Sequence, residues 1–274
     1  FLILQMIKCI DTQHFIPCLM AQNIFKMKDL YIYTLRIADC SLILGQRMCE
    51  WCSKGPTLEE DIALSNIGLD LFGQANGFYE YASKIDGDKS ADELAFKRNE
   101  REFFNFQISE QKNEHFGTTM VRNFLRDAFK YLFYTELKSS KDETLAALAS
   151  KSIKEVKYHL RHSTNWVIRL GDGTNESKIK VQKSLDFLWQ FTGEFFEMDE
   201  VDEKMLKQGI GVDNKRLKSE WDKIVNDTID KAKLKKPKDG YMATGSKKGI
   251  HTEHLGLLLA EMQYLPRAYP DAKW

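Results

Sequence analysis

Acidic and histidine side chains at helical spacing have the clearest potential for chemistry in this chain. Glu155, His159 and His162 stand at i, i+4 and i+7, which places three possible metal ligands on one face of a helix. Asp127 belongs to the preceding predicted helix, in line with aromatic residues, so we expect it to face inward. Helical bundles build two-metal sites from inward-facing carboxylates and Glu-x-x-His pairs. These four residues are therefore candidate ligands.

The first two predicted helices offer poorer ligands. Their candidate inward polar residues are Asp39, Ser41, Gln46, Asn66, Asp70 and Gln74. Asp70 and Gln74 do not form a Glu-x-x-His pair, and an amide is a poor ligand for iron. A buried carboxylate must be paired or neutralised, so Asp127 and His159 could instead satisfy one another. We favour such a polar pair over a metal site.

Two lysines between glycines form a second candidate site near the C-terminus. Lys247 and Lys248 could contact phosphates, including those of a CoA nucleotide. The alternative, which we favour, is a solvated loop. Because the forty Lys and Arg residues balance forty Asp and Glu residues, no basic surplus indicates a nucleic acid or an anionic membrane as partner.

Two histidines follow these lysines. His251 and His254, with Glu261 further along, could form a metal site on one helix. The alternative is that the imidazoles cap helix ends and meet Glu253 or Glu261. We favour this structural role, because apolar residues at helical spacing show that the same segment is used for packing.

Cysteine usage indicates reduced thiols rather than a disulfide framework. The five cysteines are an odd number, in a chain long enough to bury a sizeable core. Cys49 and Cys52 have the spacing of a redox pair or half a zinc site, but no second pair and no βαβ pattern accompany them. We interpret them as small residues near a helix end.

The elements that position these residues are predicted to be helices. Only five prolines occur, and apolar residues recur at steps of three and four. Thr57 and Glu60 have the spacing of a capping box. The predicted helices cover residues 29–52, 57–87, 117–139, 142–171, 177–196, 214–233 and 251–268, with short turns over 88–114 and a loop over 233–249. No stretch alternates as a strand does, so the sequence predicts an all-α bundle.

The N-terminal 26 residues differ from the rest. They are apolar in patches but interrupted by charges, and resemble neither a signal peptide nor a membrane span. We predict an N-terminal extension over residues 1–26 and one helical domain over 27–274. No apolar run approaches the roughly 20 residues that a bilayer requires, so we expect a cytoplasmic protein without a membrane partner.

Several motifs resemble a known family, the C subunits of the phenylacetyl-CoA epoxidases of phenylacetate degradation. The matching stretches are residues 33–36, 44–47, 50–52, 63–75, 153–161, 247–256 and 260–265. The resemblance implies a ferritin-like bundle, with additional C-terminal helices, that pairs with a catalytic A subunit of the same fold. It also implies that the complex epoxidises the ring of phenylacetyl-CoA with di-iron, dioxygen and electrons from a reductase subunit.

Compared with the catalytic subunit's pattern, this chain departs at most ligand positions. The Glu-x-x-His pairs fall on Leu71 with Gln74 and on Val156 with His159, and the carboxylate of the first helix falls on Ser41. Asp127 and His159 alone remain, with Glu155 one place out of register. The resemblance thus implies vestigial ligands, with no catalytic residue, metal or cofactor in this chain.

The function predicted from sequence is therefore a non-catalytic structural subunit that stabilises the catalytic A subunit. The alternative is an independent metal-dependent oxygenase with a site around Asp127, Glu155 and His159.

Overall fold

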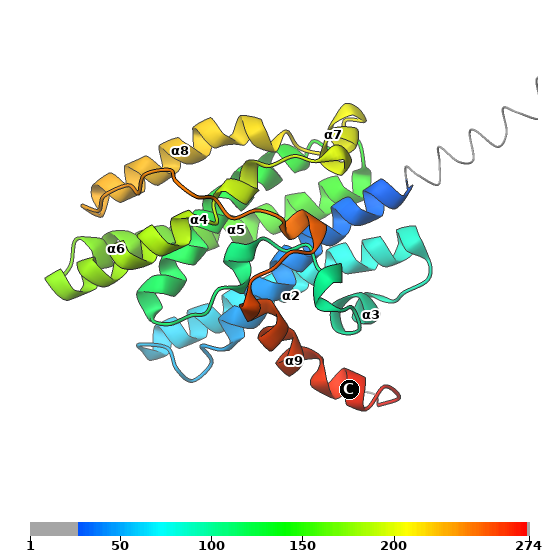
Figure 1. Cartoon of the computed structure of the whole chain (residues 1–274), viewed down its shortest axis with the longest axis horizontal. Helices are drawn as coiled ribbons and strands as arrows, with labels where there is room; N and C mark the ends of the chain where they lie inside the picture. The colour runs from blue at the N-terminus through cyan, green and yellow to red at the C-terminus, as the bar shows by residue number, and fades with distance from the viewer. Residues whose placement is uncertain (1–26, 273–274) are drawn as a thin grey trace, which may run out of the picture.

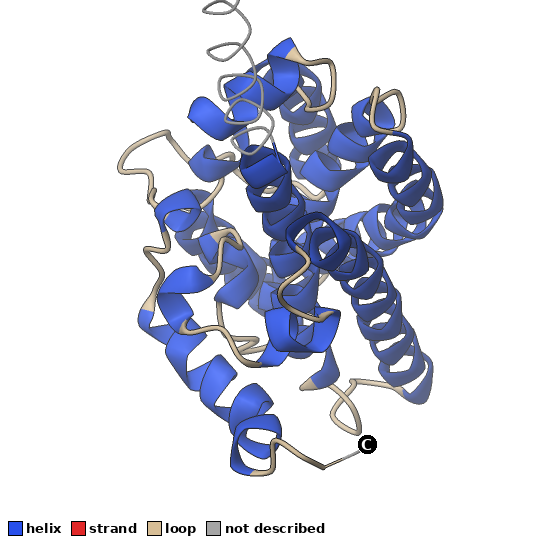
Figure 2. Ribbon diagram, turned by 90° about the vertical axis from the view of Figure 1, so that its right-hand side faces the viewer, coloured by secondary structure: helices blue, strands red, loops and turns tan. Residues whose placement is uncertain are grey.

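The computed structural model describes residues 27–272, and within this range the chain forms helices and loops without a strand (Figure 2). The longest elements are a helix over residues 27–49, hereafter helix 27–49, followed by α2 (Leu58–Asp86), α4 (Phe116–Leu137) and α5 (Glu143–Gly171). The predicted all-α bundle is confirmed. The predicted N-terminal extension, residues 1–26, lies outside the described residues. The domain boundary at residue 27 therefore stays a prediction.

Shorter elements complete the described chain. They are α3 (Ala91–Phe96), η1 (Glu100–Glu102), η2 (Gln107–Glu110), α6 (Asn175–Trp189), η3 (Gly193–Phe196), α7 (Glu200–Lys207), α8 (Asn214–Lys231), η4 (Ser246–Lys248) and α9 (Glu253–Ala268). The predicted helix over 177–196 ends earlier, at Trp189, and a separate 3-10 turn follows it. Helix α7, which is only eight residues long, was not predicted from the sequence.

Of the two hydrogen bonds of the predicted capping box, the one accepted by Thr57 forms at the start of α2. Thr57 accepts a hydrogen bond from the backbone N–H of Glu60, and Gly87 ends the helix at a φ of 79°, which glycine adopts without strain. The carboxylate of Glu60 does not return to the cap; it lies 2.8 Å from His162 on α5. A contact between helices therefore replaces the local one.

Helix α4 lies at the centre of the molecule. It packs most extensively against α5 and also contacts α6 and α8, and most of its residues are buried. Figure 1 shows α8 and α9 at opposite edges of the molecule, with α4 and α5 between them. This position buries most of the charged residues of α4, although Glu136 near its C-terminal end is exposed.

Aromatic rings fill the space between η2, α4, η3 and α8. Phe195 lies 5.1 Å from Phe106 and 5.0 Å from Phe129, between ring centroids, and Phe196 lies 5.4 Å from Trp221. Such pairs add specific geometry to the burial of apolar area. No helix between residues 27 and 272 combines the length and apolar character needed to cross a membrane.

Candidate functional site

Three side-chain pairs join α2 to α5 and form what we call the polar seam. The pairs are Gln74 with Glu155 at 2.9 Å, Asp70 with His159 at 3.0 Å, and Glu60 with His162 at 2.8 Å. The Asp70 side chain is 39% exposed whereas that of His159 is 1% exposed, so the seam reaches from solvent into the bundle. Burial raises the pKa of Glu155, although the hydrogen bond from Gln74 opposes this effect.

The predicted pairing of Asp127 with His159 is wrong. Asp127 is buried and accepts a hydrogen bond at 3.1 Å from Nη1 of Arg126, its neighbour in the chain. His159 instead bonds Asp70 through Nε2, and its Nδ1 has no partner among the described residues. The i, i+4 spacing predicts which face of a helix a residue occupies, but not which neighbouring helix supplies its partner.

Three buried cations follow one another along α4, and we call them the α4 cation row. Arg122, Arg126 and Lys130 stand four residues apart and are at most 2% exposed. Arg122 donates to the carbonyl of Gln111 at 2.7 Å and to Oδ1 of Asn113 at 2.9 Å. Burial lowers the pKa of Arg122 to about 9, so its guanidinium remains protonated at neutral pH.

Asp39 is a buried carboxylate with a full set of donors. It accepts hydrogen bonds from the hydroxyl of Tyr79 at 2.5 Å and from the backbone N–H of Phe104 at 2.8 Å, and it pairs with the guanidinium of Arg98. The guanidinium also lies over the Phe103 ring, 4.2 Å from its centroid. Arg98 belongs to the charged stretch that was predicted to be irregular, and nothing local in the sequence identified it as the partner of Asp39.

His251, considered above as one of two possible metal ligands, has other partners in the structure. His251 lies two residues before α9, where its Nδ1 is 2.9 Å from Oε2 of Glu110 and its Nε2 is 2.8 Å from the Phe103 carbonyl. Burial alone would lower the pKa of His251, but Glu110 and the carbonyl raise it. His251 therefore meets a glutamate as expected, but this residue is Glu110 rather than Glu253 or Glu261, and the N-cap position of α9 is occupied by Thr252 rather than by the imidazole.

His254 keeps the predicted neighbour. Its Nδ1 lies 4.0 Å from Oε1 of Glu253, at the limit of an ion pair. The Glu253 side chain is 85% exposed, so this contact contributes little.

The two candidate phosphate-contacting lysines differ in availability. Lys247 donates to the carbonyl of Glu197 at 2.6 Å and pairs with Asp202, so its ammonium is engaged within the chain. Lys248 is exposed. The prediction of a phosphate contact is untested, and the geometry favours Lys248 alone.

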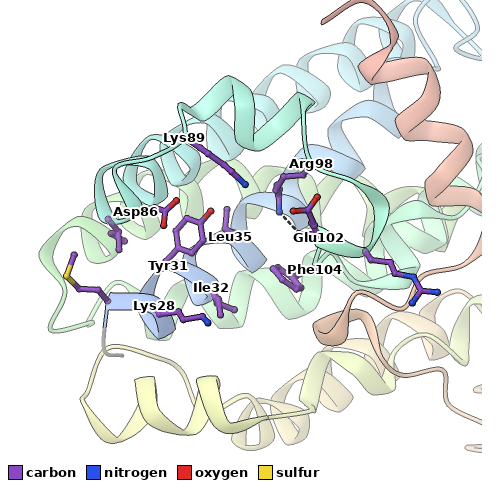
Figure 3. Close-up of a pocket in the computed structure, with 12 residues that line it drawn as sticks. Lys28, Tyr31, Ile32, Leu35, Asp86, Lys89, Arg98, Glu102 and Phe104 are labelled. Carbon is purple, nitrogen blue, oxygen red and sulfur yellow. Dashed lines mark hydrogen bonds between the residues drawn. The ribbon is translucent and has the colours of Figure 1, made fainter. Parts of the chain in front are cut away.

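A cavity of about 640 Å³, which was not predicted from the sequence, lies beside the start of helix 27–49 (Figure 3). Its apolar lining includes Ile32, Leu35 and Phe104. Burial raises the pKa of Tyr31, which also lines it, to about 12. The cavity meets Arg98, whose Nη1 donates to the carbonyl of Glu102 at 2.7 Å, but it lies apart from the polar seam.

The inward-facing acids and histidines of this bundle contact other side chains instead of gathering around one point. Within residues 27–272, no three His, Cys, Asp or Glu side chains converge in a way that could hold a metal ion. The acids of the polar seam already have partners, and Asp127 is paired with Arg126. The α4 cation row adds positive charge in the interior, and like charges repel strongly at low dielectric.

The comparisons with known proteins agree with this architecture. A family model described as "Phenylacetic acid catabolic protein" matches residues 20–274, which begins seven residues before the predicted domain boundary. An Escherichia coli (strain K12) protein, named as the C subunit of 1,2-phenylacetyl-CoA epoxidase, is 47% identical over 248 residues, which cover 90% of this chain and 100% of that relative.

The fold is therefore a ferritin-like helical bundle with additional C-terminal helices. The chain belongs to the phenylacetic acid catabolic protein family, and the resemblance identified from sequence motifs is confirmed.

Proposed function

We propose that this chain is the non-catalytic structural subunit of a multicomponent di-iron oxygenase that epoxidises the ring of phenylacetyl-CoA in phenylacetate catabolism. The relative's name supports the identity of the complex. In this proposal the chain pairs with a catalytic A subunit that holds the di-iron, and a reductase subunit supplies electrons. We place the complex in the cytoplasm.

The observation that carries this proposal is the chemistry of the bundle interior. Two-metal sites in bundles need several free carboxylates and histidines that project inward. Here Glu155 and His159 are hydrogen-bonded to side chains of α2, and Asp127 is paired with Arg126. Three buried cations also lie along α4. This interior favours a stable scaffold over the binding of two iron cations.

Exposed apolar side chains support a role in assembly. On α2, Leu58 and Leu69 are 73% and 64% exposed, and on α9, Leu257 and Tyr264 are 61% and 65% exposed. Single exposed apolar residues are ordinary, but several on two long helices suit a chain that buries them against other subunits. An obligate interface of this kind buries roughly 2,000 Å² or more.

Co-expression with a catalytic A subunit tests the pairing. We expect one peak in size-exclusion chromatography at micromolar concentration, with iron in that peak and epoxidation of phenylacetyl-CoA once the reductase is added. The chain purified alone should contain far less than one iron per molecule and give no turnover. Two separately eluting subunits would contradict the pairing, and stoichiometric iron with turnover in the isolated chain would establish the independent oxygenase instead.

A Glu155→Gln variant separates the two functions within the complex. Gln retains the size of Glu155 and can still accept the hydrogen bond of Gln74, but it is a poor iron ligand. A structural subunit should support unchanged turnover, as should the matched variant Glu80→Gln on an exposed position of α2. Loss of turnover in the first variant alone would favour the metal-dependent alternative.

The CoA contact is a separate and weaker part of the proposal. Calorimetry with phenylacetyl-CoA should show binding that decreases in Lys248→Ala if this exposed lysine meets the phosphates. Lys247→Ala is the comparison, because it removes the pair with Asp202 and should lower stability without being specific for the ligand. Identical isotherms for the wild type and Lys248→Ala would remove this contact from the proposal.

A further inference from the structure

A cavity of about 30 Å³ lies where helix 27–49, α4, α7 and the start of α8 meet. This volume holds about one water molecule or one monatomic ion. The charged residues that line it are Arg36, Lys130, Asp202 and Lys247, and the polar ones include Asn214 and Tyr33, whose hydroxyl accepts a hydrogen bond from the backbone N–H of Val212. The remaining walls are mainly aromatic.

Lys130 and Nε of Arg36 are donor groups of this cavity that have no hydrogen bond or ion pair among residues 27–272. The Lys130 side chain is buried, and no hydrogen bond or ion pair joins its ammonium to any of residues 27–272; the nearest groups include the rings of Phe133 and Tyr134, with centroids 5.1 and 5.3 Å from Nζ. Nε of Arg36 is also buried without a partner among these residues. An unpaired buried donor costs free energy, so Nε of Arg36 favours an acceptor, and Lys130, which lines the same cavity, offers a second cationic donor to it.

The cationic side chains around the cavity exceed the carboxylates by one charge. Arg36 pairs with Asp199, at 2.9 and 2.5 Å, and with Asp202 at 3.3 Å. Lys247 also pairs with Asp202. The three cations Arg36, Lys130 and Lys247 therefore face two carboxylates.

Among the residues that line the cavity, Asp202 is the only Asp or Glu, so the lining supplies no further carboxylate. Burial raises the pKa of the Cys40 thiol, which lines the same cavity and is therefore neutral at physiological pH. The next cation of α4, Arg126, is paired with Asp127 and contributes no net charge.

We infer that this cavity binds one small monovalent anion, of which chloride is the cellular example. Lys130 and Nε of Arg36 donate to it, and the Asn214 side-chain amide, whose oxygen has no partner among the described residues, donates when its oxygen and nitrogen are exchanged. Asn214 is also the first residue of α8, and the N-terminus of a helix favours negative charge. The ion joins helix 27–49 to α4 and α8, a role that is independent of the proposed epoxidase function.

Thermal unfolding of the full chain in sodium chloride and in sodium gluconate, at equal ionic strength, tests this inference. Gluconate is too large for the cavity. We expect chloride to raise the unfolding midpoint by roughly 3–5 °C at a tenfold excess over its dissociation constant. Lys130→Met should abolish the difference between the salts, whereas Lys157→Met, at an exposed position of α5, should preserve it.

A bromide soak of wild-type crystals gives a readout that does not depend on the folding of a variant. An anomalous peak in the cavity, together with chloride-specific stabilisation, supports the site. A water molecule there with equal midpoints in both salts overturns it. A bromide peak without any effect on the midpoint shows an adventitious ion only and also overturns it.

Discussion

The polar seam and the α4 cation row differ in how their charged side chains are paired. In the seam, acidic residues of α2 meet histidines of α5 and Gln74 meets Glu155, so each charged group has a neighbour on the facing helix. In the cation row, the only carboxylate that Arg126 meets among the described residues is that of the adjacent Asp127, and Lys130 meets none. The seam reaches solvent and its charged groups can be paired across two helices, whereas the central helix α4 buries most of the charged residues that it carries.

The largest expected effect is in the cation row. Arg126→Met leaves Asp127 as a buried carboxylate without its counter-charge, which should lower the free energy of unfolding by about 3–5 kcal/mol. Urea denaturation measures this change. The double variant Arg126→Met with Asp127→Asn should recover most of the loss, because no buried charge remains. A single variant as stable as the wild type would show that this pair contributes nothing.

Lys130 gives the second largest effect, which depends on pH. Burial lowers the pKa of Lys130 from its ordinary value of 10.5 to about 8. Between these values the unfolded chain binds more protons than the folded one, so the free energy of unfolding rises with pH. Relative to Lys130→Met in chloride-free buffer, the wild type should gain about 2–3 kcal/mol from pH 8 to 10.5. Parallel pH profiles would contradict this expectation.

The seam should respond less, because one side of it meets solvent. Asp70→Ala removes the partner of Nε2 of His159, a ring that is nearly fully buried, and should cost about 1–2 kcal/mol in urea denaturation. Asp70→Asn retains an acceptor oxygen and is the matched control, with a smaller expected loss. Equal losses in the two variants would show that the hydrogen bond is not the source of the effect.

The smallest expected effect is that of Glu155→Gln on stability. The hydrogen bond with Gln74 can persist, and Glu155 is only partly buried, so the change in free energy of unfolding should stay within about 0.5 kcal/mol. Burial raises the pKa of Glu155, so this neutral substitution removes a charge that the folded state disfavours. A loss as large as that expected for Asp70→Ala would show that these two of the three pairs of the seam contribute equally to stability.

Much of the fold could be predicted from the sequence. The periodic apolar residues of α2, α4 and α5 predicted the ends of these helices to within about two residues, a usual margin for helix boundaries. Helix α7 was missed because eight residues are too few to establish a helical period. The candidate site was only half predicted: Glu155, His159 and Asp127 are positioned at least partly inside the bundle, but their partners were assigned incorrectly or not at all.

The sequence by itself determined the longer helices, the inward placement of Asp127 and His159, and the family to which the chain belongs. Local periodicity and motif identity are properties of neighbouring residues, so they can be seen without a structure. The tertiary structure alone decided that His159 bonds Asp70, that Arg98 neutralises Asp39, that His251 meets Glu110 and that Lys130 lacks a carboxylate partner. Each of these contacts depends on residues about 60 or more positions apart in the chain, or on the packing around α4. The spacing of neighbouring residues predicts neither long-range contacts nor packing.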